Sequence, residues 1–175
     1  MMEQAENLRD VIRETTLLEP RRLADRLGIS LRIASETFQQ TGSFKFRAGY
    51  NLAALVEERT ILTASSGNFG QALAYATKLL EKNAIIVMPD TSAQVKMDAV
   101  REHGGTVVPI NVTVKSRAEG VAELAAEHPD AFIASAFNDP RVIEIVREFD
   151  SQEKWIFAIC HGIQILISAG LAEGT

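Results

Sequence analysis

Residues Thr60–Gln71 read TILTASSGNFGQ, and this stretch decides the fold. It passes from a β-branched run, typical of a strand, through a turn of small and polar residues into the pattern of an amphipathic helix. A second apolar run, Ala84–Met88, follows that helix. A strand, a tight turn, a helix and another strand make a βαβ unit, in which the two strands are parallel.

The same alternation continues outward in both directions. The expected strands are Ser30–Ala34, Thr60–Ala64, Ala84–Met88, Thr106–Ile110, Ala131–Ser135 and Trp155–Ile159. The expected helices are Ala5–Glu14, Arg21–Leu27, Phe44–Glu58, Phe69–Glu81, Ser92–His103, Lys115–His128, Pro140–Phe149 and Ile163–Leu171. Short strands interleaved with longer helices predict an α/β fold, with residues 1–175 as a single domain around a three-layer, doubly wound and mainly parallel sheet.

Composition excludes several classes of function. The net charge is −5 and no Lys/Arg cluster is present, so a nucleic-acid surface is not expected. The longest apolar stretch, Ile156–Leu166, is interrupted by polar residues, so we expect no membrane span. The polar N-terminus is not a signal peptide, and a single cysteine suits a reducing compartment, so the chain is expected to be cytoplasmic. No residues have metal-ligand spacing, so no metal is expected.

The turn Ser65–Asn68 is the first candidate site. In open parallel sheets, ligands bind beyond the carboxyl ends of the strands, near the N-termini of the following helices. Two hydroxyls and a glycine leave backbone N–H groups free to bind a carboxylate or a phosphate. The alternative is that the turn is only a helix N-cap.

Lys45 is the second candidate. It lies in Thr41–Ala48, which reads TGSFKFRA and places a lysine in the first turn of an expected helix. The positive end of a helix dipole, and an apolar pocket between Phe44 and Phe46, would both lower the pKa of this amine. A lysine with a lowered pKa suits imine formation with a carbonyl cofactor. The alternative is a solvated helix lysine.

Taken together, the two segments resemble the fold-type II pyridoxal-phosphate (PLP) enzymes, especially the threonine and serine dehydratases and serine racemase. The resemblance spans roughly residues 8–143 and implies a small amino acid as substrate. It is also compatible with a homo-oligomer. It implies that Lys45 binds PLP covalently, that Asn68 bonds the ring oxygen, and that Ser66 acts as a second acid/base. It also implies that the substrate carboxylate binds to Ser65, Ser66, Gly67 and Asn68.

The sequence departs from that family at several positions. Ala34 stands where the family has a lysine, Phe69 where a histidine is common, and the order of Ala48 and Gly49 is reversed. The family's tetraglycine phosphate loop has no counterpart in these 175 residues, nor has the residue that faces the pyridine nitrogen. The expected PLP site is therefore incomplete.

Cys160 carries a separate hypothesis. It follows the apolar run Trp155–Ile159 and precedes His161 and Gly162, as in a nucleophile elbow, where a helix N-terminus lowers the thiol pKa. Residues 140–174 resemble the ThiJ/PfpI superfamily, which implies a cysteine nucleophile or an oxidation-sensitive thiol. Gly162 would then offer its N–H to an anion of the cofactor. The alternative is a buried structural cysteine.

Three functions therefore remain open. The first is a PLP-binding domain with ammonia-lyase or racemase chemistry, in which residues 1–143 are PLP-enzyme-like. The second is a cysteine hydrolase or thiol sensor, carried by a ThiJ/PfpI-like strand, elbow and helix over residues 144–175. The third is a catalytically inert α/β scaffold, such as a chimera of these two families.

Overall fold

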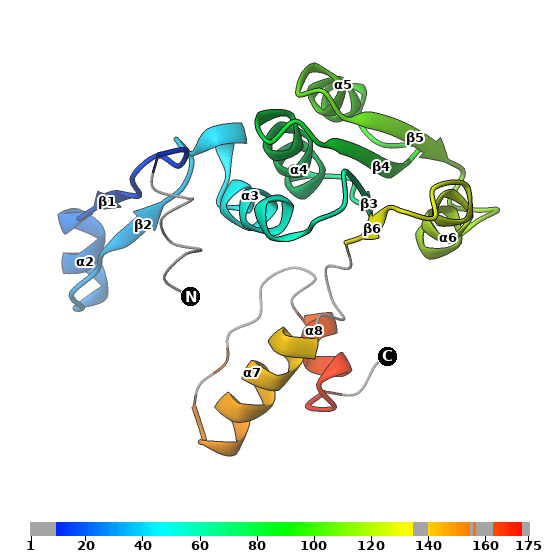
Figure 1. Cartoon of the computed structure of the whole chain (residues 1–175). Helices are drawn as coiled ribbons and strands as arrows, with labels where there is room; N and C mark the ends of the chain where they lie inside the picture. The colour runs from blue at the N-terminus through cyan, green and yellow to red at the C-terminus, as the bar shows by residue number, and fades with distance from the viewer. Residues whose placement is uncertain (1–9, 135–139, 155, 157–162, 173–175) are drawn as a thin grey trace. The chain divides into compact units, whose positions relative to one another are not determined.

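A computed structural model describes residues 10–134, 140–154, 156 and 163–172 (Figure 1). The chain divides into two compact units, residues 1–133 and 134–175. The first unit contains a parallel sheet with its helices and a separate antiparallel strand pair. Among the described residues, no helix is both long and apolar enough to cross a membrane. The division of the chain into segments 1–143 and 144–175, which rests on the two family resemblances, remains a prediction.

The parallel sheet has four strands in the order β5-β4-β3-β6. These are β3 (Thr60–Ala64), β4 (Asn83–Pro89), β5 (Thr106–Ile110) and β6 (Phe132–Ile133). The two central strands are buried along most of their length, which explains why they are continuous apolar runs rather than alternating ones. Each pairs in parallel register with its neighbours, for example Ile61 with both Ala84 and Phe132.

Helices cover both faces of this sheet (Figure 1). Helix α4 (Asn68–Leu79) packs on one face, where its Gly70 meets Ile86 of β4. Helix α6 (Arg117–Glu127) packs on the other, where its Gly120 meets Val87. Adjacent residues of a strand point to opposite faces. With α5 (Gln94–Glu102) beside α4, the predicted three-layer, doubly wound α/β fold is confirmed.

Helix α3 (Lys45–Leu55) packs along α4. Gly49 makes this possible, because a Cβ at this position would lie 3.1 Å from the carbonyl carbon of Ala72 and 3.1 Å from the nitrogen of Leu73. Phe46 is fully buried, and its ring centroid lies 5.9 Å from that of Tyr50 and 5.6 Å from that of Tyr75. Backbone contact and aromatic packing together fix α3 on α4.

The segment before α3 differs from expectation. The strand expected at Ser30–Ala34 forms as β2 (Ile33–Ser35), but it pairs antiparallel with β1 (Thr16–Leu18), outside the parallel sheet. Helix α2 (Arg21–Leu27) connects them and has the expected bounds, and Gly28 ends it in the left-handed conformation. No helix forms in the described part of Ala5–Glu14, because the backbone N–H and C=O of Arg13 bond to the side chain of Gln39 instead.

An ion pair joins this segment to α3. Arg47 donates from Nε and Nη2 to the two carboxylate oxygens of Glu36, at 2.8 Å each. The side chains are 32% and 16% exposed, so the pair is partly buried. Bonds from Arg47, and then from the Thr15 hydroxyl, hold the pKa of Glu36 at about 2, below its ordinary value of 4.5. Glu36 in turn raises the pKa of Arg47. We call the Glu36–Arg47 pair the clamp.

The second unit contains α7 (Pro140–Ser151) and α8 (Ile163–Ser168), which pack together. Arg147 donates from Nε to the backbone oxygen of Ala169 at 3.0 Å, and this bond ties the two helices. The expected strand Trp155–Ile159 lies outside the described residues except for Ile156. Cys160 and Gly162 also lie outside them, so the cysteine elbow stays a prediction.

Gly49→Ala tests the close approach of α3 and α4. In a helix interior alanine is more favourable than glycine by about 1 kcal/mol, so an unhindered site would gain stability. Because the new Cβ would press on the backbone of α4, we expect the free energy of unfolding to fall by about 1–3 kcal/mol. Urea unfolding followed by circular dichroism measures the change.

Gly120→Ala is the matched control. It is also a helix-interior position, but the nearest atoms to its Cβ would be side-chain carbons of Val87 and Ile110, at 3.3 to 3.4 Å, which can shift. Its effect on the free energy of unfolding should stay within about 1 kcal/mol of zero. If the two variants lose the same stability, backbone contact does not fix α3 on α4.

The clamp makes stability depend on acid pH. The folded-state pKa of Glu36 is depressed, so its contribution is fully present above about pH 4.5 and is lost as the pH falls towards 2. Glu36→Gln should lower the free energy of unfolding by about 1 kcal/mol at pH 7 and flatten its decline between pH 4.5 and 2. Urea unfolding at a series of pH values measures both.

Glu19→Gln serves as the control for this series. Glu19 pairs with Arg32 at 3.0 Å, but both side chains are largely exposed, at 58% and 74%, so water screens the pair. Its loss should leave the acid decline unchanged. A decline that flattens equally in both variants would contradict the role assigned to the clamp.

Candidate active site

The turn Ser65–Asn68 lies at the point where the strand order reverses. From β3 the chain moves outward through β4 to β5, and then returns to β6 on the other side of β3. In a doubly wound sheet the ligand crevice lies at this reversal, beyond the carboxyl ends of the strands. The turn follows the last residue of β3, Ala64, so the fold places it where a ligand site is expected.

Ser65 organises the turn from within. Its Oγ accepts hydrogen bonds from the N–H groups of Gly70, at 3.0 Å, and Gly67, at 3.4 Å. The hydroxyl thus supports the start of α4, which has no side-chain cap at Gly67. The N–H groups of Asn68 and Phe69 are in the first turn, where a helix has no acceptor of its own, and they can serve an anion.

Lys45 is the first residue of α3 and is half-buried. Its Nζ lies 4.6 Å from the centroid of the Phe44 ring, a cation–π contact. The expected apolar pocket between Phe44 and Phe46 is wrong, because Phe46 is buried in the core while Phe44 is 57% exposed. The two rings lie on different sides of the helix start.

The two predicted parts of the site are carried by helices that pack together. Lys45 lies one helical turn before Gly49 in α3, and Asn68 lies one turn before Ala72 in α4. Because Gly49 lies against the backbone of Ala72, the N-terminal ends of both helices are close to this contact. The short helix η1 (Gln40–Gly42), just before Lys45, also packs against α4. Within the described ranges, no hydrogen bond or ion pair joins Lys45 to the turn directly.

The residues before Lys45 show two signs of a ligand site. Thr41 has φ of 57°, a conformation that costs a β-branched residue energy and that clusters at functional sites. The hydroxyls of Thr41 and Ser43 are buried without a hydrogen-bond partner. Buried polar atoms are nearly always paired, so unpaired hydroxyls beside a half-buried lysine fit a site that completes its bonding with a polar ligand.

These residues fit PLP in part. The amine of Lys45, the N–H groups at the start of α4 and the exposed amide of Asn68 are suitable partners for an aldehyde, a carboxylate and a ring oxygen. Ser66 and Gly67 are half-buried in the same turn. Lys45, Ser66, Gly67 and Asn68 were all expected from the sequence, but the clamp was not. The opposite charges of Glu36 and Arg47, eleven residues apart, were the available signal.

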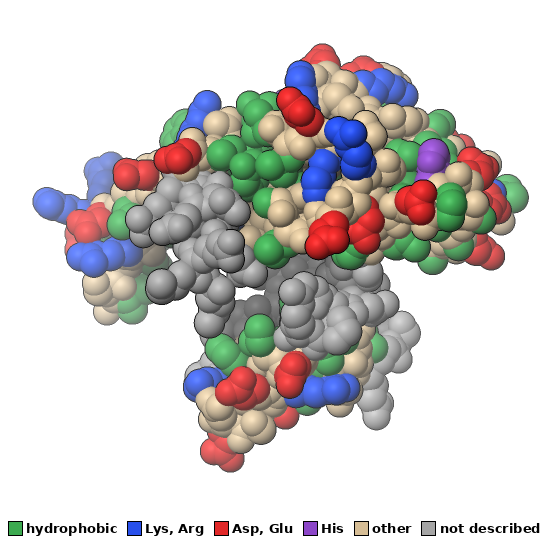
Figure 2. All heavy atoms as spheres, viewed as in Figure 1, with side chains coloured by type: hydrophobic (Ala, Val, Ile, Leu, Met, Phe, Trp, Pro, Cys, Tyr) green, Lys and Arg blue, Asp and Glu red, His purple; other side chains and the backbone are tan. Residues whose placement is uncertain are grey.

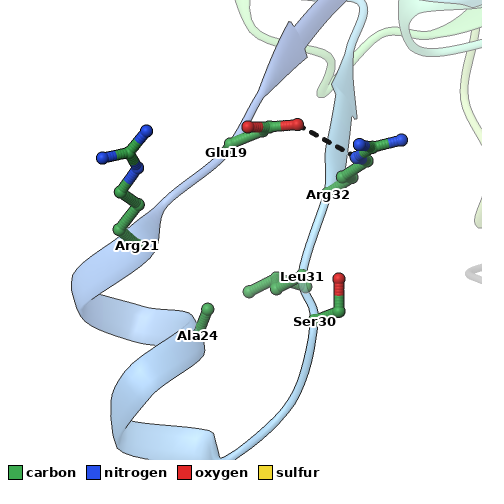
Figure 3. Close-up of a pocket in the computed structure, with 6 residues that line it drawn as sticks. All are labelled: Glu19, Arg21, Ala24, Ser30, Leu31 and Arg32. Carbon is green, nitrogen blue, oxygen red and sulfur yellow. Dashed lines mark ion pairs between the residues drawn. The ribbon is translucent and has the colours of Figure 1, made fainter.

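Two surface hollows lie elsewhere. One, of about 210 Å³, is bounded by the β1–α2–β2 segment, where Glu19 and Arg32 pair across it (Figure 3). The other, of about 750 Å³, is lined by the residues that precede β3 and β6, namely Glu57–Thr60 and Glu127–Ala131. It is therefore at the amino ends of the strands, the edge opposite to the turn. On the face drawn in Figure 2, charges of both signs lie interspersed.

Comparison with known proteins agrees with this geometry. The chain matches the family model of pyridoxal-phosphate dependent enzymes over residues 8–153. It is 32% identical to L-threo-3-hydroxyaspartate ammonia-lyase of Saccharomyces cerevisiae, over 82% of this chain and 45% of the relative. It is 36% identical to serine racemase of Homo sapiens, over 78% of this chain and 42% of the relative.

Solved structures give the same result. Threonine deaminase isoform 2 of Solanum lycopersicum has a TM-score of 0.71 at 32% identity, covering 97% of this chain and 50% of that one. Serine racemase of Dictyostelium discoideum has a TM-score of 0.73 at 26% identity, covering 97% and 59%. This chain thus spans about half the length of the proteins that it matches. It belongs to the pyridoxal-phosphate dependent enzyme family, as the segments around Lys45 and Asn68 had indicated.

Proposed function

We propose that this chain is a PLP-binding domain of the threonine and serine dehydratase kind, with a small β-hydroxy amino acid as substrate. The observation that carries the proposal is that Lys45 begins one of two packed helices, that the turn Ser65–Asn68 leads into the other, and that this turn lies at the reversal of the sheet. The names of the relatives support the substrate class, since they act on threonine, serine and 3-hydroxyaspartate. The chemistry would be that of an ammonia-lyase or a racemase.

Lys45 is the residue that would hold the cofactor. Its amine has no ion-pair partner among the described residues, and it starts a helix whose backbone is fixed on α4. When bound, PLP would supply an electron sink for charge that develops at the substrate Cα. Asn68, which is exposed, would donate from its side-chain amide to the ring oxygen.

The turn would bind the substrate carboxylate. N–H groups at the start of α4, with Ser66 and Gly67 beside them, form an anion site supported by the helix dipole. Because the Ser65 hydroxyl already accepts two backbone N–H bonds, its part would be to shape the turn rather than to contact the substrate through its lone pairs. Ser66 would take or return the proton at the substrate Cα.

Two further points belong to this proposal. A cytoplasmic location rests on the single cysteine of the sequence. A homo-oligomer rests on the family resemblance alone.

The PLP proposal predicts a specific covalent label. After incubation of the full chain with PLP and reduction with borohydride, peptide mapping should find the pyridoxyl group on Lys45. Lys45→Ala should abolish both this label and the accompanying visible absorbance. Lys154→Ala is the matched control, because Lys154 also lies over a phenyl ring, 4.9 Å from that of Phe149, and its loss should change neither.

Labelling spread evenly over the surface lysines, or confined to another lysine, would refute this assignment. The inert scaffold would then be the better description of the PLP-like segment. Circular dichroism of each variant ensures that loss of the label does not reflect loss of the fold.

A second candidate rests on the C-terminal segment. The family match ends at residue 153, which leaves Cys160, His161 and Gly162 outside it. We propose for this segment a ThiJ/PfpI-like elbow, in which Cys160 is a nucleophile or redox-sensitive thiol and Gly162 offers its N–H to an anion. The chain would then be a chimera of two families.

Reaction of Cys160 with iodoacetamide tests this candidate. A thiol at a helix N-terminus should react in the folded protein, with a pH midpoint below about 8.5. Cys160→Ser provides the blank for the mass-spectrometric measurement. If the thiol reacts only after denaturant is added, it is part of the core and the elbow is wrong.

A further inference from the structure

We propose that Glu36 and Arg47 are positioning residues, whose clamp holds the strained turn before Lys45 and so determines where its amine is presented. The role given to Lys45 rests on the proposed function, whereas the effect of the clamp on the turn is independent of it. Separate measurements therefore test the presentation of Lys45 and the effect on the turn.

The clamp spans the turn that it would hold. Glu36 lies before η1, and Arg47 lies in the first turn of α3. Between them, Thr41 and Gly42 both have positive φ, 57° and 68°. The left-handed region is unfavourable for a β-branched residue, so Thr41 keeps this conformation only because contacts on both sides impose it.

The side of the turn that carries Glu36 is itself fixed by a buried side chain. Gln39 is 4% exposed, and its Oε1 accepts from the N–H groups of Arg13 and Gln40, each at 3.0 Å. Its Nε2 donates to the Arg13 carbonyl at 2.8 Å and to Glu36 at 3.3 Å. Glu36 is therefore held from its own side of the turn by Gln39, in addition to Arg47.

Arg47 also bonds to the segment that precedes Glu36. Besides its bond to Glu36, Nη2 lies within hydrogen-bond distance of the Thr15 hydroxyl, at 2.9 Å, and of the Arg13 carbonyl, at 3.2 Å. Nη2 has two N–H groups, so these three acceptors share them. A planar guanidinium anchored through Nε and Nη2 has little freedom left, and a lysine could not reproduce its two parallel bonds to the carboxylate.

The opposite side of the same helical turn is fixed by the core. Phe46 is fully buried against Tyr50 and Tyr75. Lys45 is thus followed by one residue held in apolar packing and one held in the clamp. Among the described residues the amine of Lys45 has no hydrogen-bond or ion-pair partner and lies over the ring of Phe44, so the backbone on either side of Lys45 decides where its side chain begins.

The test uses the full chain with Glu36→Gln and Arg47→Lys. Arg32→Lys is the control, because it replaces the arginine of an exposed pair. The first measurement is the rate at which PLP and borohydride label Lys45, per folded molecule. The second is hydrogen–deuterium exchange of the backbone between Thr41 and Phe46, which needs no cofactor. Circular dichroism gives the folded fraction.

We expect labelling of Lys45 to slow about tenfold in both clamp variants, since small misplacement of a reacting group is costly. Labelling of the other lysines should stay unchanged, and exchange should rise between Thr41 and Phe46, and beside Arg13 and Thr15, which Arg47 also contacts. Arg32→Lys should match the unaltered chain in both measurements.

An unchanged labelling rate at Lys45 would overturn the inference, even if the melting temperature falls, because the clamp would then be merely structural. If PLP labels a different lysine in the unaltered chain, the proposed function fails. Hydrogen–deuterium exchange alone then tests whether the clamp holds the turn. Faster exchange between Thr41 and Phe46 would still support the clamp as the holder of the turn, and unchanged exchange would refute it.

Discussion

At Gly49 the backbone of α3 lies directly against the backbone of α4, and the arrangement of the first unit depends on this contact. Most helix pairs are separated by side chains that can change rotamer, so their spacing adjusts to substitution. Here the partner atoms are the carbonyl carbon of Ala72 and the nitrogen of Leu73, which cannot move without moving the helix. The relation between the starts of α3 and α4 is therefore rigid.

The helices on this face of the sheet are joined further by a row of rings. Phe46 of α3 packs on Tyr75 of α4, and Tyr75 packs on His103 at the end of α5, with ring centroids 5.1 Å apart. Burial lowers the pKa of His103, which favours its neutral ring. Ring contacts thus link the start of α3, through α4, to the end of α5.

The sequence predicted what depends on local pattern. The bounds of β3 and β5 are those expected, because Ser65–Gly67 ends the first run, while Gly104-Gly105 and Asn111 bound the second. Helix α6 begins at Arg117 rather than Lys115, because Ser116 and Glu119 form a capping box. The strand β1 was not predicted, since it has only three residues and Leu17 is 68% exposed, which leaves no periodic signal.

The candidate site was predictable to a similar degree. The chemistry of Lys45 and of Ser65–Asn68 can be predicted from the types of residue at these positions. The clamp could not be predicted in this way, because Glu36 and Arg47 meet only when the turn between them adopts a strained backbone. The inward direction of Phe46 also depends on α4, a partner that local periodicity cannot identify.

The reversal of the strand order also has a consequence for the order of folding. Ile61 pairs with Ala84 about twenty residues ahead, but with Phe132 about seventy residues ahead. Closing the longer loop costs about 1 kcal/mol more conformational entropy, which favours pairing of β3 with β4 before pairing of β3 with β6. If β6 pairs last, the edge beside the Ser65–Asn68 turn is the last part of the sheet to form. A small molecule that binds there would then stabilise the finished fold without accelerating its formation.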